Sequence, residues 1–322
     1  ANVLYRAIFL EPAPDRALER DDSGRDGNRN GLAAQIHVAL EHAHRIVLDI
    51  QTPERGEMNV ARTPPPWGPA LVEDYPEIEN YVRFKTPMVS WLVSNEAADK
   101  RFHEKGFYFA DHTVFEFFNL IMLSGDPQTA LVEPRTVVLS ETAAQKYFGD
   151  EDPMGRTLRL DNAYDFQITG VIEDIPRHSH FDFDILASIS TLGVIPIYGG
   201  DVYLTWRNGL GPDLYTYVRV RKGTAPRELE NKLPEFLGRH MGEVLNRINV
   251  RFSPRLQPLS RIHLYSNLEA EIRANSDIRY VYIFSAIAVF VLIIASINFI
   301  KLSTARSAAR AKEAVMRKVI GG

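Results

Sequence analysis

Short stretches in which hydrophobic and polar residues alternate run through the chain from residue 45 to residue 259. Alternation with a period of two is typical of half-buried β-strands, because successive side chains point to opposite faces of a sheet. On this basis we predict strands over residues 45–51, 78–84, 89–93, 105–109, 136–139, 157–161, 165–175, 214–220 and 250–259.

Between these strands, apolar residues recur at intervals of three and four, which predicts amphipathic helices. The helices are expected over residues 32–42, 68–74, 114–121, 141–148 and 224–248. Strands and helices are mixed without a regular β-α-β-α repeat. The expected fold class is therefore α+β, with two lobes, rather than a doubly wound parallel sheet.

The most strongly patterned stretch, residues 135–160, reads as a strand, a helix and a second strand. Ser140 precedes the helix and can accept a hydrogen bond from its first turn, while Gly149 follows it in the position that favours a left-handed C-cap. In the next strand, Gly170 indicates a bulge or a close approach of two backbones. These residues serve caps and turns, and the stretch is nearly empty of side chains suited to catalysis.

The predicted helix over residues 224–248 is long enough to bury a continuous stripe against a sheet. Thr224 is the expected N-cap, because its hydroxyl can accept a hydrogen bond from the first turn. The buried stripe is expected to consist of Leu229, Leu233, Phe236, His240 and Val244.

A different pattern follows at residues 280–300, which contain no charged residue, no proline and no glycine. A helix of that length is roughly 30 Å long, the thickness of the hydrocarbon core of a bilayer. A buried core helix is the other interpretation, but core helices are rarely apolar on every face. We therefore predict a transmembrane helix over residues 277–302 in contact with the lipid bilayer. Tyr280 and Tyr282 lie where an interfacial aromatic belt is expected.

Residues 301–322 carry six basic side chains and one acidic one, although the whole chain has a formal net charge of −4. Positive residues flank membrane spans on the cytoplasmic side. The expected topology is a cytoplasmic basic helical tail over residues 303–322 and an extracytoplasmic domain over residues 33–276. The expected location is the cytoplasmic (inner) membrane of a bacterium, with the core domain on the periplasmic or extracellular side.

The first 32 residues show neither a membrane span nor a signal peptide. An apolar run is interrupted by Arg6 and ended by Pro12, and residues 21–31 have the composition of a disordered segment. We expect residues 1–32 to be disordered or atypical, and the chain to be a fragment of a longer protein or a truncated copy.

Composition excludes several classes of function. The negative net charge argues against nucleic-acid binding, and the absence of cysteine excludes disulfides, cysteine-ligated zinc and thiol catalysis. The sequence contains no P-loop lysine motif, dinucleotide-binding glycine motif, nucleophile elbow or zinc-protease helix. We therefore expect no catalytic residues, no cofactor and no enzymatic activity in this chain.

One stretch, HSHFDFD, contains possible metal ligands. On a strand, His178, His180, Asp182 and Asp184 would share one face. In an extended chain these four residues spread over roughly 20 Å, too far for one ion. A half-buried strand with an aromatic inner face explains the same alternation, so no metal site is expected. A metal-dependent envelope hydrolase is the hypothesis that would require one.

The tail forms two stripes if the helix continues beyond the span. One stripe is charged (Arg306, Arg310, Glu313, Arg317) and the other is apolar (Ala308, Ala311, Val315, Val319). Such a helix can bind lipid headgroups or a cytoplasmic partner, and the spacing of the residues does not distinguish these two possibilities.

Four stretches in this order resemble ABC transporter permeases of the MacB/FtsX-like superfamily: VVLSETAAQKYFGDEDPMGRTLRL, DFQITGVIEDIPRHSHFDFD, LQPLSRIHL and INFIKLSTARSAARAKEAVMRKVIGG. The resemblance implies a MacB-like periplasmic core domain followed by a transmembrane helix. It also implies a separate cytoplasmic P-loop ATPase subunit, a second permease copy in a dimer, and a periplasmic adaptor or envelope substrate. The tail resembles the segment that abuts the ATPase, so contacts are expected from Lys312, Glu313, Arg317 and Lys318.

The expected function is that of the membrane subunit of a mechanotransmission ABC transporter, in which ATP hydrolysis elsewhere moves the extracytoplasmic domain. The alternative is a single-span envelope sensor or binding protein that works without an ATPase. Antibiotic efflux, lipoprotein release, peptide sensing and control of cell-wall hydrolases all fit this architecture, so the sequence leaves the substrate open.

Overall fold

The computed structural model describes residues 42–321 except 88–89, 176–180, 199, 209–210, 274 and 276. The predicted disordered segment 1–32 and most of the predicted helix 32–42 lie outside the described residues. The chain divides into two compact units, Ala1–Asn275 and Ser276–Gly322. We call them unit 1 and unit 2 and describe each by itself.

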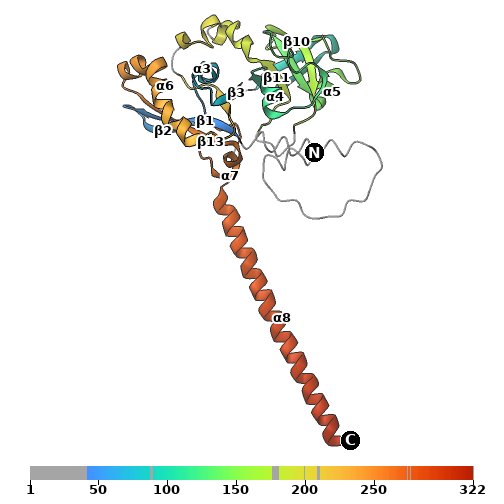
Figure 1. Cartoon of the computed structure of the whole chain (residues 1–322). Coiled ribbons are helices and arrows are strands. Elements are labelled where there is room, and N and C mark those ends of the chain that lie inside the picture. Colours follow the sequence, from blue (N-terminus) through green and yellow to red (C-terminus); the bar gives the residue numbers. More distant parts are fainter. Residues whose placement is uncertain are drawn as a thin grey trace. The chain divides into compact units, whose positions relative to one another are not determined.

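Unit 1 is built on one mixed β-sheet (Figure 1). In its described part the strands pair in the order β13-β1-β12-β3-β6-β11-β8-β10-β9-β4-β5, with β2 added to β1 and β7 added to β10. The strands are β1 (Ala43–Thr52), β2 (Gly56–Val60), β3 (Ile78–Lys85), β4 (Trp91–Asn95), β5 (Lys100–Glu104), β6 (Phe107–Ala110), β7 (Met122–Gly125), β8 (Thr136–Ser140), β9 (Thr157–Leu160), β10 (Tyr164–Ile172), β11 (Ile185–Ser188), β12 (Tyr215–Val220) and β13 (Arg251–Pro258).

The helices of unit 1 cover the sheet at separate places (Figure 1). They are α3 (Trp67–Asp74), α4 (Val114–Phe118), α5 (Glu141–Phe148), α6 (Pro226–Arg247) and α7 (Ile262–Tyr265). Helix α6 packs on β13 at one end of the sheet, and α5 packs on β8 and β10 in the other part. This combination of a mixed sheet with helices confirms the predicted α+β class.

The sheet consists of two halves that meet between β3 and β6. We call β1, β2, β3, β12 and β13 with α3 and α6 the α6 half, and β4 to β11 with α5 the α5 half. The ladder between β3 and β6 has only two register pairs, Phe84–Ala110 and Lys85–Phe109. By comparison, β12 and β3 share six register pairs within the α6 half, and β11 and β6 share four within the α5 half.

Three hydrophobic clusters fill unit 1. One belongs to the α6 half and includes Ile46, Val218 and Phe236, and another belongs to the α5 half and includes Phe166. The third contains residues of both halves, such as Phe84 and Tyr108. Each half therefore has its own core, and a shared core joins the halves on one face.

Four strands went unpredicted, for reasons visible in their side chains. Strand β2 has only two apolar side chains, Met58 and Val60, which are half-buried, and β5 consists mostly of charged residues. Strand β11 is buried on both faces, so it shows no alternation. Strand β7 lies where the helix over residues 114–121 was expected. That prediction was wrong beyond Phe118, because Asn119 has a φ of 51° and ends α4 after five residues.

Helix α5 confirms the predicted N-cap: the Ser140 hydroxyl accepts a hydrogen bond from the Ala143 amide at 3.1 Å. At the other end, Gly149 has a φ of 64° but a ψ of −128°. This conformation is open almost only to glycine, yet it is not the left-handed helical cap that we predicted.

Helix α6 corrects two predictions. Its N-cap is Ala225, not Thr224, and Pro226 occupies the first turn, where a missing amide proton costs nothing. Leu229, Leu233 and Phe236 are buried as predicted, but His240 is only half-buried and Val244 is 41% exposed. The stripe instead continues through Leu237, Met241 and Leu245, because a real helix turns by 3.6 residues and drifts away from a fixed spacing of four.

Gly170 confirms the predicted close approach. The ladder between β10 and β8 shifts register between Ile168 and Gly170. A Cβ at Gly170 would lie 2.8 Å from the Met122 sulfur, and one at Gly125 would overlap the Thr169 carbonyl oxygen. The two facing glycines allow β7 to lie close against β10.

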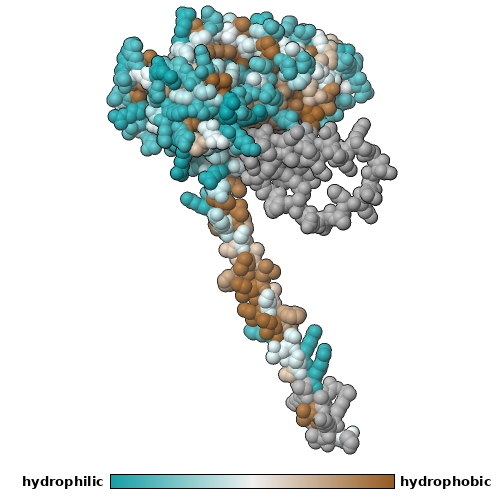
Figure 2. All heavy atoms as spheres, viewed as in Figure 1, coloured by the Kyte–Doolittle hydropathy of each residue, from teal (hydrophilic) through white to brown (hydrophobic). Residues whose placement is uncertain are grey.

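Unit 2 contains helix α8 (Ile278–Ile320). Its segment Ile278–Ala308 is long and apolar enough to cross a membrane. The most apolar stretch of that segment has a mean hydropathy of 2.7, and none of it is buried. Figure 2 shows the apolar side chains along this helix. Asp277 caps the helix by accepting a hydrogen bond from the Arg279 amide at 2.8 Å.

Candidate functional site

We predicted a strand over the HSHFDFD segment. The described part of this segment, residues 181–184, does not form one. His178 and His180 lie outside the described residues. Residues 181–184 are irregular, and β11 starts only at Ile185, because the amides of Asp184 and Ile185 both donate to the Gly106 carbonyl. The aromatic inner face is nevertheless real, since Phe181 and Phe183 are buried in the shared core.

Among the residues that the structure describes, no group of three or more histidine, aspartate or glutamate side chains lies close enough together to hold a metal ion. The Asp182 side chain is 71% exposed and lies 3.9 Å from Arg273. The pKa of Asp184 is raised by burial and by the nearby Glu104. Such a shift has a structural cause and identifies no ligand set.

A polar cluster in the α6 half is a better functional candidate. Arg45, on β1, is completely buried. Its guanidinium donates to both carboxylate oxygens of Glu271, at 2.6 and 2.8 Å, and to the Gln257 side chain, at 2.7 and 3.2 Å. It also donates to the Ser266 hydroxyl at 3.0 Å, and that hydroxyl in turn donates to Glu271. We call these four residues the Arg45 cluster.

Two members of the Arg45 cluster belong to the segment that precedes helix α8 in sequence. We call residues 266–273 the linker segment; only residues 274–277 separate it from α8. A bidentate arginine–carboxylate pair fixes both distance and orientation. The cluster therefore holds the linker segment firmly against β1 and β13.

The backbone of the linker segment is bound as well. The Ala61 amide donates to the Glu269 carbonyl at 3.1 Å, and the Glu269 amide donates to the Asn59 carbonyl at 2.8 Å. The Tyr215 hydroxyl donates to the Ala270 carbonyl at 2.6 Å. Strands β1, β2, β12 and β13 thus all contact the linker segment.

The electrostatics of the Arg45 cluster keep both charges in place. Burial by itself lowers the pKa of Arg45, but hydrogen bonds to Glu271 and the charge of Glu271 outweigh it and raise the pKa. Removing one partner of such a buried pair leaves an uncompensated charge, which costs about 3–5 kcal/mol. The sequence analysis predicted a role for neither Arg45 nor Glu271. The one signal available was that Arg45 is a charged residue inside the mostly apolar strand HRIVLDI.

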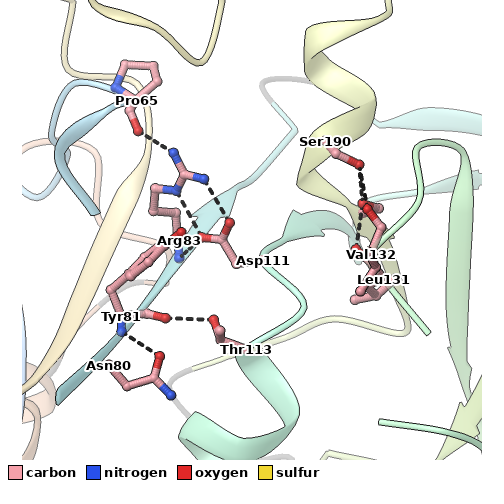
Figure 3. Close-up of polar contacts among 10 residues, drawn as sticks. Pro65, Asn80, Tyr81, Arg83, Asp111, Thr113, Leu131, Val132 and Ser190 are labelled. Atoms are coloured by element: carbon pink, nitrogen blue, oxygen red, sulfur yellow. Dashed lines mark hydrogen bonds and ion pairs between the residues drawn. The ribbon is translucent and has the colours of Figure 1, made fainter. Parts of the chain in front are cut away.

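A second buried charged group lies where the two halves of the sheet meet (Figure 3). Arg83, on β3, donates from Nε and Nη2 to the two oxygens of Asp111, at 2.9 and 2.8 Å, and from Nη1 to the Pro65 carbonyl at 2.5 Å. Lys85 pairs with Asp213, which also accepts a hydrogen bond from the Tyr203 hydroxyl. We call Arg83, Lys85, Asp111 and Asp213 the charged cluster.

The charged cluster was not predicted from the sequence either. Its carboxylates follow β6 and precede β12, and nothing in their local pattern distinguishes them from surface residues. The structure brings them together with two cations on β3, so that burial of Arg83, Lys85 and Asp111 is balanced by pairing.

The predicted ATPase-contact residues Lys312, Glu313, Arg317 and Lys318 belong to the C-terminal part of α8. Their side chains lie outside the described part of the structure. Their contact role therefore stays a prediction.

Comparison with known proteins adds to this geometry. The chain matches the family model of the MacB-like periplasmic core domain over residues 29–236. No match was found among curated proteins.

Three solved structures are similar to this chain. A domain of a permease protein from Porphyromonas gingivalis has 22% identity and a TM-score of 0.59, over 76% of this chain and 98% of that one. The periplasmic region of MacB from Actinobacillus actinomycetemcomitans has 16% identity and a TM-score of 0.48, over 70% and 92%. The extracellular domain of the ABC-type transporter YknZ from Gram-positive bacteria has 12% identity and a TM-score of 0.41, over 66% and 99%.

The likeness to the Porphyromonas gingivalis domain supports the fold of unit 1 and, at this identity, nothing beyond the fold. The family match, in contrast, extends over more than half of the chain. In sequence it is followed by α8, a candidate membrane span. The chain therefore belongs to the MacB-like periplasmic core domain family of ABC transporter permeases.

Proposed function

We propose that this chain is the membrane subunit of a mechanotransmission ABC transporter. In this proposal a separate cytoplasmic P-loop ATPase hydrolyses ATP, α8 moves, and unit 1 carries the movement to an efflux or envelope process outside the inner membrane. The chain itself has no enzymatic activity. Its other partners are a second copy of the permease and a periplasmic adaptor or an envelope substrate.

The observation that supports this proposal best is the way the linker segment is held. A flexible connection would absorb any displacement of α8. Here the Arg45 cluster and three backbone-directed hydrogen bonds fix the linker segment to four strands. In this proposal, a displacement at the start of α8 passes through the linker segment to β1 and its neighbours.

The ATPase is expected to bind the tail of α8 through Lys312, Glu313, Arg317 and Lys318. Glu313 separates two pairs of basic residues in the tail, and Glu313 and Arg317 are four residues apart, so they lie on the same face of a helix. The positive-inside bias favours a cytoplasmic location for the basic tail. If α8 spans the membrane, unit 1 then lies on the periplasmic side in this proposal.

The test uses the tagged full chain, purified in detergent from its native membranes. ATPase activity should co-purify with it, and charge reversal by Arg317→Glu with Lys318→Glu should remove that activity. The matched double reversal Lys222→Glu with Arg227→Glu, at two exposed positions of unit 1, is the control and should retain it. If no ATPase co-purifies with the unmodified chain, the proposal is wrong and the single-span sensor is supported.

The transmission step is tested in the same complex by hydrogen exchange with and without a non-hydrolysable ATP analogue. The analogue should change exchange of the β1 and β13 amides. In the double variant Arg45→Met, Glu271→Leu, which leaves no unpaired buried charge, that change should disappear while ATPase activity is retained. The exposed pair Glu243→Gln, Arg247→Met is the control. A nucleotide-dependent change that persists in β1 of the double variant contradicts transmission through the Arg45 cluster.

A further inference from the structure

The ladder between β3 and β6, which joins the two halves, is as short as any in the described sheet of unit 1. It has two register pairs, whereas β1 and β13 share eight. In the described chain order, the backbone passes between the halves only between β3 and β4 and between β11 and β12. Few backbone hydrogen bonds therefore oppose a rotation of one half relative to the other.

Side chains supply most of the polar contacts at this junction (Figure 3). Asp111 accepts from the Arg83 backbone amide at 2.8 Å in addition to its two bonds with the guanidinium. The Thr113 hydroxyl donates to the Tyr81 carbonyl at 2.6 Å. Arg219, on β12, donates to the Phe117 carbonyl at 2.8 Å. Side-chain bonds of this kind break and re-form without disrupting a ladder.

The two faces of the junction differ in chemistry. On one face, Val82 and Phe84 of β3 lie in the same apolar core as Tyr108 and Ala110 of β6. Because side chains alternate along a strand, Arg83 and Lys85 lie on the opposite face. On that face the charged cluster separates the core of the α6 half from the core of the α5 half.

This asymmetry determines where the halves separate at least cost. Opening the apolar face would expose the shared aromatic core, in which the Phe84 and Phe181 ring centroids are 4.8 Å apart. Opening the charged face returns Arg83 and Asp111 to water, and their hydration offsets much of the lost pairing. Lys85 stays paired with Asp213, whose backbone is bound to Thr63 in the α6 half. We propose that the junction of β3 and β6 is a hinge, about which the two halves open on the face that carries the charged cluster.

Helices α5 and α6 are on the face that opens. Phe107 and Phe109 of β6 alternate with Tyr108, which lies in the shared core, and they pack with Tyr147 of α5. Phe236 of α6 packs in the other separate core. The distance between α5 and α6 therefore increases when the hinge opens.

This proposal does not depend on the proposed function, and its test needs no ATPase. The chain has no cysteine, so two introduced cysteines carry unique spin labels. One label replaces Gln145 on α5 and the other replaces Glu243 on α6 in the purified full chain. Pulsed electron spin resonance then gives the distribution of distances between them. The control pair, Glu57 and Glu243, lies within the α6 half.

The pair across the junction should give two distances or a distribution broader than that of the control pair. Removing the charge of Asp111 with Asp111→Asn should shift the open-to-closed ratio by about tenfold toward the longer distance, because a closed hinge then buries an unpaired Arg83. The milder Thr113→Val removes one neutral hydrogen bond and should shift it by about fivefold without unfolding the domain.

Two outcomes overturn the hinge. One is a cross-junction distribution as narrow as that of the control pair in the unmodified chain, which needs no variant to interpret. The other is a broad distribution that Thr113→Val and Asp111→Asn leave unchanged while both variants remain folded. A shift confined to the cross-junction pair supports it.

Discussion

The α6 half and the α5 half of unit 1 are assembled in different ways. The α6 half takes its strands from both ends of the domain, β1 to β3 and β12 to β13, and all its ladders are antiparallel. The α5 half comes from one uninterrupted stretch and includes parallel pairs, β10 with β8 and β11 with β6.

The α5 half is therefore an insertion into the α6 half, because its strands all lie between β3 and β12 in the chain. The linker segment contacts β1, β2, β12 and β13, all in the α6 half. Forces that enter along the chain therefore act on the α6 half through four strands, and they act on the α5 half through the Arg273–Asp182 ion pair at 3.9 Å and across the junction. The following predictions test whether the halves are as separate as their construction indicates.

The largest effect is expected from emptying one core at a time. Phe236→Ala and Phe166→Ala each remove a fully buried ring, in the α6 half and the α5 half respectively. Each should lower the free energy of unfolding of its own half by about 3–5 kcal/mol. Hydrogen exchange of the full chain in detergent should show the loss of protection mainly in the half that carries the substitution.

The same measurement can contradict the comparison. If either variant lowers protection equally throughout unit 1, the two halves unfold as one cooperative unit. The two-pair ladder would then be no weak point, whatever its length.

A smaller pair of effects is expected at two glycines. Gly125, in the α5 half, has a φ of 95° and no room for a Cβ, so Gly125→Ala should destabilise by about 1–3 kcal/mol. A Cβ added at Gly238, in α6, would meet no atom within 4 Å. Gly238→Ala should therefore stabilise the α6 half by about 0.5–1 kcal/mol. Chemical denaturation measures both, and a destabilising Gly238→Ala would show that α6 is not regular there.

The smallest effect is a difference in response to acid. Burial lowers the pKa of His44, in the α6 half, below 6.5, so the folded state binds this proton less readily than the unfolded state. Stability is therefore full above pH 6.5 and is lost as the pH falls below it, by at most about 1.4 kcal/mol per pH unit for one proton. In the α5 half, burial and Glu104 raise the pKa of Asp184, so its contribution is present at low pH and lost as the pH rises.

Unfolding midpoints between about pH 5 and pH 8 test the first of these signs. The substitution His44→Gln should reduce the loss of stability of the α6 half as the pH falls, and the substitution of the exposed His103 in His103→Gln should not. An unchanged slope in His44→Gln would assign the acid sensitivity to another group.

The elements that could be predicted from the sequence were those whose pattern is local. Strand β1, helix α5 with its Ser140 cap, and the close approach at Gly170 all follow from side chains within one turn or one strand. The α+β class followed from the order of these elements.

What escaped prediction depends on partners distant in the chain. Arg45 is 226 residues from Glu271, and Arg83 is 28 residues from Asp111, so no local pattern announces either pair. Strand β5 is charged because it is an edge strand, and charge at an edge prevents pairing with other chains. These ion pairs and the edge position of β5 can be recognised in the sequence only after the neighbours of each strand are known.

The insertion has a consequence for biosynthesis. Residues 44–51 of β1 pair with β13, whose residues leave the ribosome about two hundred positions later. Until then β1 has an unsatisfied edge, whereas every strand of the α5 half already has its neighbours at hand. The nascent chain therefore completes the inserted half first, while β1 to β3 still lack β12 and β13 as pairing partners. During this interval the unpaired strand edges make the domain most prone to aggregation.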